Sequence, residues 1–426
     1  MSVIKRWLIT GASGAIGLQV LKRMFKDNFS GIEVVATDVR PLPKFLSHPK
    51  LSFLSIDIRS DKIRELLVDG NFHGIIHLAS IVSPGKKSNR EFEYSVDVLG
   101  TKKILEAAKA ANVKQIIVTS SGAAYGYHSK LPEWIQEEEP AVGNEVFAYS
   151  WHKKLVEDML ADYRQHTPEL KQLILRPGTV LGSGMKNQIT DLFEKPMVIG
   201  ILGCDSPFVF IWDQDVAEII YQGMVKEKSG IFNLAGDGKI TNLELAKILK
   251  KPLIKIPSLV LQFILKTLKS LNLTQYGPEQ IAFLKYRPVL DNSKLKNEFG
   301  YVPTYSSKEV LENFLKPQKN FYIYRPLDPA NLSPLKVFTQ FDRLDDLIIE
   351  SKIETTQQKE ELLNWISYFE GQKSGLIYLL DEHGNLKDSE YVQSPHIKLC
   401  TLKEIEQTKK LLIYSKNEIS TALSTI

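Results

Sequence analysis

The sequence predicts an α/β fold in which a parallel β-sheet carries helices on both faces. An apolar run over residues 3–9 leads into a glycine-rich turn and then into an amphipathic stretch over 16–25, which indicates a strand, a turn and a helix. Further apolar runs of strand length alternate with stretches of helical spacing. Because helices usually connect the strands of a parallel pair, this alternation favours a parallel sheet that is buried on both faces.

The glycine-rich turn supplies the first functional signal. Gly11, Gly14 and Gly17 recur every three residues between the predicted strand and helix. Gly11 allows a tight turn, Gly14 lets the backbone approach a pyrophosphate, and Gly17 lets the helix pack on the strand. The helix start, at Ala15 and Ile16, then offers unpaired N–H groups and a partial positive charge to that pyrophosphate. The turn therefore predicts a dinucleotide-binding, doubly wound sheet of the Rossmann type.

An acidic residue follows the next predicted strand, 32–37. Asp38 lies about 20 residues past the last glycine, where a carboxylate can bind the ribose hydroxyls of the cofactor. A carboxylate at this place repels a 2′-phosphate, so we expect NAD to be preferred over NADP. Arg40, two residues on, could bind such a phosphate and weaken the preference, which keeps NADP as an alternative cofactor.

The remaining elements continue the same alternation. The predicted strands are 51–56, 74–78, 115–119, 173–175, 208–211 and 231–234, and the predicted helices are 59–68, 91–111, 146–163 and 213–224. Thr241 and Glu244 have the spacing of a capping box at the start of another helix. Since ligands bind at the carboxyl ends of strands in such sheets, we expect the site at this edge.

The chain divides into three predicted parts. A Rossmann-type domain covers 1–181 and is completed by 208–235, and a smaller, mainly helical substrate lobe covers 182–316. Prolines then mark a boundary, and 317–426 forms a C-terminal α+β extension whose role the sequence does not indicate. Within it, 359–369 reads as a helix, 375–380 as a strand and 381–385 as a turn. We expect the extension to be separable from catalysis.

Composition limits the classes of function. The chain has 426 residues, of which 43% are hydrophobic and 24% are charged, as in ordinary soluble proteins. A net charge of +4 is small for this length, so we expect neither nucleic acid nor a membrane as a partner. The run 256–271 carries two lysines and predicts an amphipathic core helix, not a membrane span.

The cysteines and histidines argue against structural disulfides and metals. Cys204 and Cys400 are the only cysteines, which excludes a disulfide framework and fits a reducing compartment. The N-terminus lacks the layout of a signal peptide, so we expect a cytoplasmic protein. His77 reads as a structural or groove-lining residue, and His128 and His152 have no further ligand at metal spacing. We therefore predict no metal.

A tyrosine and a lysine open the predicted helix 146–163. Tyr149 and Lys153 are four residues apart and therefore share one helix face. A nearby ammonium and a positively charged nicotinamide both favour the phenolate form of a tyrosine. Such a tyrosine can exchange a proton with a substrate hydroxyl while a hydride moves to or from the cofactor.

Taken together, the ordered motifs resemble those of the extended short-chain dehydrogenase/reductase family, also called the NAD-dependent epimerase/dehydratase family. The resemblance covers about three quarters of the chain, from residue 3 to residue 316. The matching motifs are 10–17, Asp38, 57–58, 77–80, 100–101, 120–126, Tyr149 with Lys153, 176–177, 215–217 and 233–236.

This resemblance implies roles for individual residues. It makes Ser121 the catalytic serine that hydrogen-bonds the reacting oxygen, Tyr149 the acid/base, and Lys153 the residue that binds the nicotinamide ribose and favours the phenolate. The residues that it places around the cofactor are Asp57 and Ile58 at the adenine, Leu78, Ala79 and Ser80 along the groove, and Pro177 near the nicotinamide.

Three positions depart from the family pattern. Asp97 stands where asparagine is usual, and Phe208 and Thr179 stand where nucleotide-sugar enzymes commonly have arginine and asparagine. Phe208 cannot neutralise a diphosphate, so we expect a smaller or less charged hydroxyl or keto substrate. Lys86, Lys87 and Arg90 could supply charge from another loop, although a solvated loop is the plainer interpretation; the acidic run 137–139 also reads as solvated.

The preferred function is that of an NAD(P)-dependent enzyme that moves a hydride and a proton at a hydroxyl or keto carbon of a sugar-like or other small molecule. Epimerisation, dehydration and simple dehydrogenation share the Ser-Tyr-Lys triad, so the sequence does not separate them. The alternative is an NAD(P)-binding sensor or scaffold that acts through its C-terminal region. A small-molecule substrate is the expected partner, and a homodimer is an open alternative to a monomer.

Overall fold

The structure is a computed structural model that describes residues 4–42, 46, 48–82, 89–182, 185, 187–271, 277–278 and 280–315, together with the backbone of three later strands. The chain forms two compact units. The first comprises residues 1–42 and 48–315, and the second comprises 43–47 and 316–426.

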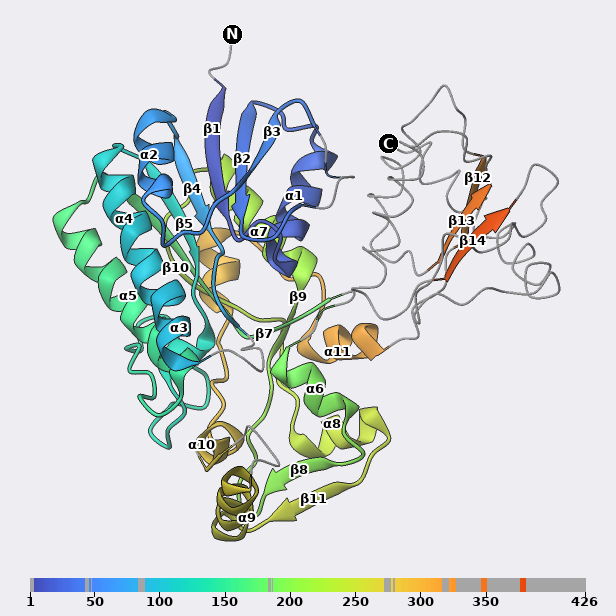
Figure 1. Ribbon diagram of the computed structural model, residues 1–426. Helices are drawn as coiled ribbons and strands as arrows, with labels where there is room; N and C mark the ends of the chain where they lie inside the picture. Colours follow the sequence, from blue (N-terminus) through green and yellow to red (C-terminus); the bar gives the residue numbers. More distant parts are fainter. Residues whose placement is uncertain are drawn as a thin grey trace. The chain divides into compact units, whose positions relative to one another are not determined.

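A seven-stranded parallel sheet organises the first unit, as the sequence predicts (Figure 1). The strands lie in the order β10 (Gly230–Leu234), β6 (Lys171–Pro177), β5 (Gln115–Thr119), β4 (Gly74–His77), β1 (Lys5–Thr10), β2 (Ile32–Asp38) and β3 (Leu51–Ser55). The order runs outward from β1 in both directions, so the glycine-rich turn after β1 lies at the switch point where ligands bind in such sheets.

Helices cover both faces of this sheet (Figure 1). The helices on one face are α1 (Ala15–Lys26) and α7 (Asp213–Val225); those on the other are α2 (Lys62–Asp69), α4 (Thr101–Ala110) and α5 (Ala148–His166). The predicted helix 91–111 is interrupted: α3 (Arg90–Tyr94) passes through a π-helical turn, η1 (Ser95–Gly100), into α4. This wider turn contains the buried Asp97.

The sheet is packed by complementary large and small residues. Trp7 of β1 is completely buried, and Gly74 is its register partner on β4. A Cβ added to Gly74 would lie 2.3 Å from the Trp7 ring, so only glycine leaves room for the indole. The position of Gly74 at the start of β4 is therefore a packing requirement of the neighbouring strand.

The smaller lobe is mainly helical, as the sequence predicts, and also contains two short strands. Its elements are α6 (Gln188–Glu194), β8 (Val198–Ile201), α8 (Asn242–Leu249), β11 (Leu253–Ile256), α9 (Ser258–Ser270), α10 (Gln280–Lys285) and α11 (Ser307–Leu315). β8 and β11 form a two-stranded parallel sheet. The predicted strand 208–211 appears as β9 (Phe210–Trp212), which pairs with β7 (Thr179–Leu181) outside the main sheet.

Two sequence predictions for the lobe have different outcomes. The capping box is confirmed: the Thr241 side chain accepts the Glu244 N–H, and the Glu244 side chain accepts the Thr241 N–H. The helix predicted over 256–271 is confirmed as α9, but its predicted position in the core is wrong, because Leu261 is its only fully buried residue. Most of its apolar side chains face outward, since only one narrow face packs on the lobe.

The second unit is described by the backbone of three strands. β12 (Tyr322–Pro326), β13 (Asp346–Glu350) and β14 (Leu376–Leu380) form a parallel sheet with β13 in the centre. The strand predicted at 375–380 is confirmed as β14. The helix predicted at 359–369, the turn at 381–385 and Cys400 lie outside the described residues.

Candidate active site

A cavity of about 930 Å³ opens at the carboxyl ends of the central strands and continues to the substrate lobe. The predicted site residues that line it are Gly11, Gly14, Ala15, Ile16, Gly17, Asp38, Arg40, Asp57, Ile58, Leu78, Ala79, Ser80, Ser121, Tyr149, Lys153 and Pro177. Residues from six strand ends and two helix starts thus meet in one cavity. We call the part near the glycines the cofactor half and the part near the lobe the substrate half.

The glycine-rich turn leaves the space that a bound pyrophosphate needs. Gly11 has φ +68°, and an added Cβ would lie 2.5 Å from the Ala79 nitrogen. A Cβ on Gly17 would lie 2.5 Å from the Gly11 carbonyl oxygen, so helix α1 packs directly on the turn. Gly14 precedes α1 and provides no side-chain cap, which leaves N–H groups at the helix start for an anion. These features fit a dinucleotide.

Asp38 is held in place by backbone donors. Its two carboxylate oxygens accept the Ser13 N–H at 3.0 Å and the Arg40 N–H at 2.9 Å. The Arg40 guanidinium lies beside it, with Nε 3.6 Å from Asp38 Oδ1, and donates to the Ser13 carbonyl at 3.2 Å. The Asp38 side chain is buried, whereas 65% of the Arg40 side chain is exposed. Both residues therefore adjoin the same region of the cofactor half.

An arginine that sequence reasoning missed fixes Asp57. Arg59 donates to both carboxylate oxygens of Asp57, with Nη2–Oδ2 at 2.6 Å, and lowers the pKa of that carboxyl. The Arg59 guanidinium also lies 4.9 Å from the centre of the Phe92 ring, and both residues line the cavity. The sequence contained a local signal for this ion pair, because Arg59 follows Asp57 by two residues.

The predicted triad comes together at the boundary between the two halves. Ser121 accepts the Ala123 N–H at 3.1 Å, at the start of the short helix η2 (Gly122–Tyr125). Tyr149 lies in the first turn of α5, and Lys153 follows one turn later with Nζ 5.7 Å from the Tyr149 ring centre. Lys153 also donates to the Thr119 carbonyl at 3.1 Å, which fixes its ammonium at the end of β5.

Ser150 ties the tyrosine and serine segments together. Its hydroxyl donates to the Ala123 carbonyl at 2.7 Å and accepts the Asn144 N–H at 3.0 Å. Since Ser150 is completely buried, these bonds join the start of α5 to η2 in the protein interior. The separation of Tyr149 from Ser121 is therefore set by their neighbours in sequence.

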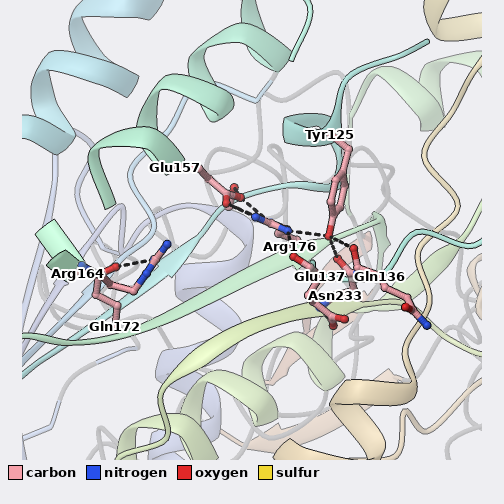
Figure 2. A network of polar contacts seen from close by, with 9 residues as sticks. Tyr125, Gln136, Glu137, Glu157, Arg164, Gln172, Arg176 and Asn233 are labelled. Carbon is pink, nitrogen blue, oxygen red and sulfur yellow. Dashed lines mark hydrogen bonds and ion pairs between the residues drawn. The ribbon is translucent and has the colours of Figure 1, made fainter. Parts of the chain in front are cut away.

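A buried polar network supports this part of the cavity (Figure 2). The Ser120 hydroxyl donates to Glu157 at 2.6 Å, and Glu157 forms an ion pair with Arg176. Arg176 continues to the Tyr125 hydroxyl at 2.8 Å, which donates to Asn233 at 2.8 Å. The network raises the pKa of Arg176, and burial raises the pKa of Tyr125 to about 12.

Glu137 corrects the interpretation of the acidic run as solvated. Glu138 and Glu139 are exposed, but Glu137 is buried and accepts the Asn233 N–H at 2.7 Å. Its carbonyl accepts a hydrogen bond from Arg176 at 3.1 Å (Figure 2). Burial raises the pKa of the Glu137 carboxyl. The acidic composition of the run gave no sign of this role, because Asn233 and Arg176, the partners of Glu137, are distant in sequence.

The three histidines noted in the sequence have separate environments. His77 is buried between the hydroxyls of Thr10 at 2.7 Å and Thr101 at 3.0 Å, and burial lowers its pKa to about 3. His152 is also buried, with Nδ1 3.5 Å from Asp97, whose other oxygen accepts the Ile81 N–H at 2.8 Å. His128 is not fully buried; its ring lies 3.2 Å from the Tyr125 carbonyl. Within the described part of the chain, no three potential ligands gather around a metal site.

The substrate half contains a cation that sequence reasoning missed. Phe208 is buried as expected, but the Arg287 guanidinium lies 3.8 Å from the centre of its ring. Arg287 itself is buried and lines the cavity, with Tyr127, Phe147 and Phe283 nearby on the same wall. The expectation of a less charged substrate, which rested on Phe208, did not take this cation into account.

Among the described residues, the basic loop brings less positive charge to the cavity than Arg287 does. Lys86 and Lys87 lie outside the described residues, whereas Arg90 is exposed and donates to the Glu145 carbonyl. Thr179, the other departure noted in the sequence, lines the cavity on β7.

Comparison with known proteins identifies the family. Residues 7–235 match the family model described as "NAD dependent epimerase/dehydratase family". The chain belongs to this family. As an NAD dependent epimerase/dehydratase it is an enzyme with NAD as its cofactor, and the resemblance inferred from the motifs is confirmed.

The relatives of this epimerase/dehydratase share modest identity. An uncharacterised protein of Mycobacterium tuberculosis is 20% identical over 313 residues, which cover 72% of this chain and 83% of that protein. A probable UDP-arabinose 4-epimerase of Oryza sativa subsp. japonica is 27% identical over 195 residues, or 43% of this chain and 45% of that protein.

Solved structures share the fold. The Thermus thermophilus UDP-glucose 4-epimerase in complex with NAD superposes with a TM-score of 0.55 at 20% identity, covering 72% of this chain and 96% of that one. MoeE5 in complex with UDP-glucuronic acid and NAD gives 0.55 at 19% identity, with 72% and 96% covered. At this identity the likeness supports the fold alone.

Proposed function

We propose that this enzyme oxidises and reduces a hydroxyl-bearing carbon of a nucleotide-linked sugar, as an epimerase does, with Ser121, Tyr149 and Lys153 as its catalytic residues. The observation that carries the proposal is Arg287, a buried cation in the same cavity as these three. A nucleotide-linked sugar brings both the hydroxyl for Tyr149 and the diphosphate for Arg287.

The surroundings of Arg287 favour an anionic ligand. Its guanidinium donates to two neutral oxygens, the Ser206 carbonyl and the Asn242 amide, while Nε has no hydrogen-bond partner. None of the described residues forms a salt bridge with it, and burial lowers its pKa to about 9. Because a buried charge without a counterion is costly, a phosphate at this place would stabilise the charged form.

The names of related proteins point to the same substrate class. The rice relative is named a probable UDP-arabinose 4-epimerase, and the neighbouring MoeE5 structures hold UDP-glucuronic acid or UDP-glucose with NAD. The expectation of a less charged substrate depended on Phe208 leaving this wall without a cation. Arg287, which stacks on that phenylalanine, removes the reason for it.

The chain's own residues can perform the proton part of the reaction. When bound, NAD accepts and returns a hydride. The Tyr149 hydroxyl exchanges a proton with the substrate oxygen, and the Ser121 hydroxyl hydrogen-bonds that oxygen. The Lys153 ammonium is held by the Thr119 carbonyl, with Nζ 5.7 Å from the centre of the Tyr149 ring. Tyr127, Phe147 and Phe283 form an aromatic wall of the same cavity.

Calorimetry on the NAD-loaded enzyme tests this proposal. UDP-, GDP- and dTDP-sugars are titrated into the wild-type enzyme and into Arg287→Gln. We expect at least one sugar nucleotide to bind, and the variant to bind it about 10- to 100-fold more weakly, as expected for the loss of a charge-assisted hydrogen bond.

Arg164→Gln is the matched control. Arg164 lies on α5 outside the cavity and bonds Gln172, so its loss should leave sugar-nucleotide affinity unchanged. NAD affinity reports that each variant is folded. If no sugar nucleotide binds, or if Arg287→Gln binds as tightly as wild type, the proposed substrate class is wrong.

A further inference from the structure

Helix α9 has two apolar faces, and only one of them packs against the lobe. Leu261 is buried, and Leu265 and Leu268 on the same face are half-buried. The second face is exposed along the helix, with Leu259 at 77% and Phe263 at 71%. The exposed apolar side chains of this face are Leu259, Val260, Phe263, Ile264 and, just past the helix, Leu271.

The two-stranded sheet at the same end of the lobe also carries exposed apolar side chains. β11 leads into α9 through Pro257, and both lie at the same end of the lobe as β8 (Figure 1). Ile199 of β8 and Ile254 of β11 are register partners and both are exposed, as is Leu202 just after β8. Large exposed apolar patches usually mark sites of interaction.

Positive charge is concentrated around the same surface. Lys266 and Lys269 lie along the remaining side of α9, between its packed face and its exposed apolar face, and Lys255 is exposed on β11. β8, β11 and α9 contain no acidic residue. The net charge of +4 for the whole chain conceals this segregation.

We propose that the α9 face and the adjoining β8–β11 edge dock the enzyme on an anionic lipid surface. An apolar helix face enters the boundary between headgroups and acyl chains, while flanking lysines meet lipid phosphates. α9 has 13 residues and is about 20 Å long, so it is suited to lie in the plane of the membrane. Among the helices of the described chain, none has the length and apolarity to cross a bilayer.

The charge pattern favours lipid over a second copy of the chain. In a contact between two copies of this surface, Lys255 and Lys266 of each copy would meet no acidic partner, because β8, β11 and α9 contain no acidic residue. Such like charges repel one another when they are desolvated at an interface, whereas an anionic bilayer neutralises all of them.

Sedimentation of the full-length, NAD-loaded protein with lipid vesicles tests the proposal. We expect binding to vesicles of phosphatidylcholine mixed with phosphatidylglycerol, weak binding to pure phosphatidylcholine, and a decrease with salt. Leu259→Ser with Phe263→Ser should reduce binding by at least about tenfold. Lys266→Gln with Lys269→Gln should reduce it by about fivefold for each lysine removed.

Matched controls come from surfaces elsewhere on the first unit. Val302→Ser removes a side chain that is 67% exposed, and Lys102→Gln removes an exposed charge on α4; both should bind vesicles as wild type does. Unchanged NAD affinity shows that every variant is folded. Three results would each overturn the proposal. The first is failure of the wild-type protein to bind mixed vesicles, and the second is equal binding by the α9 variants and the wild type. The third is a dimer in light scattering that the Leu259/Phe263 variant abolishes, without any vesicle binding.

Discussion

The cofactor half and the substrate half of the cavity are built from different kinds of sequence. In the cofactor half, most of the predicted residues lie within a few positions of a strand end, and the glycines act through the absence of a side chain. In the substrate half, the Arg287 guanidinium stacks on Phe208, which belongs to a distant segment. Backbone-based sites can be recognised in sequence, whereas sites made by side chains from distant segments require the fold.

The largest predicted effect concerns Tyr149, which lies where the two halves meet. Tyr149→Phe should lower turnover by about 10²- to 10⁴-fold, because the hydroxyl that we propose as the proton carrier is lost while the ring remains. NAD affinity and sugar-nucleotide affinity should both stay close to wild type. Steady-state kinetics and calorimetry measure the two effects separately.

Tyr163→Phe provides the control for this experiment. Tyr163 lies on the same helix, α5, but does not line the cavity, so turnover should be unchanged. If Tyr149→Phe retains a tenth of the wild-type rate, another group carries the proton. If it loses NAD affinity as well, the tyrosine belongs to the cofactor half rather than to the chemistry.

The next effect concerns the buried network that supports both halves. Glu157→Gln leaves the buried Arg176 without a full counterion and should lower the free energy of unfolding by about 3–5 kcal/mol. Urea denaturation measures it. Glu106→Gln, at an exposed position on α4, should change stability by less than about 0.5 kcal/mol. Equal effects in the two variants would show that the Glu157–Arg176 pair does not stabilise the fold.

Much of the fold could be predicted because local patterns and topology agree. The strand–turn–helix unit around Gly11, the position of Asp38 and the alternation of elements were sufficient to predict the parallel sheet. Ser121, just after β5, and Tyr149 and Lys153, at the start of α5, line one cavity. Each of these inferences depends on residues that are neighbours in sequence or on rules for parallel sheets.

Three features could not be predicted, because each depends on contacts with segments that are distant in sequence. Glu137 lies in an acidic run typical of a solvated loop, yet it is buried and accepts a hydrogen bond from the Asn233 N–H. Helix α9 has the apolar content of a core helix, but amphipathic spacing does not show how much of the helix another element covers. Arg287 had no local signal, because its role depends on Phe208.

The stability of the cofactor half should depend on pH, because His77 is buried beneath it. Its pKa is lowered from 6.5 to about 3, so the unfolded chain takes up the proton first as the pH falls. The free energy of unfolding should therefore decrease below pH 6.5, by at most about 1.4 kcal/mol per pH unit from this residue.

His77→Gln isolates this contribution. The difference between the wild-type and variant slopes, measured by urea denaturation from about pH 6.5 to about pH 5, reports His77 alone because other groups titrate in both proteins. Identical slopes would mean that the histidine is protonated in the folded state or hydrated there.

The smallest predicted effect concerns cofactor choice within the cofactor half. The Asp38 carboxylate is fixed by two N–H donors, so a 2′-phosphate placed at the ribose would meet a charge that cannot turn away. NAD should therefore bind more tightly than NADP. Arg40 is largely exposed and offers the phosphate only a flexible partner, so Arg40→Ala should weaken the residual NADP binding by about tenfold or less and leave NAD affinity nearly unchanged. Fluorescence titration with both cofactors measures this. Tighter binding of NADP by the wild-type enzyme would mean that Arg40, and not Asp38, sets the preference, because an exposed cation would then outweigh a carboxylate that the turn holds in place.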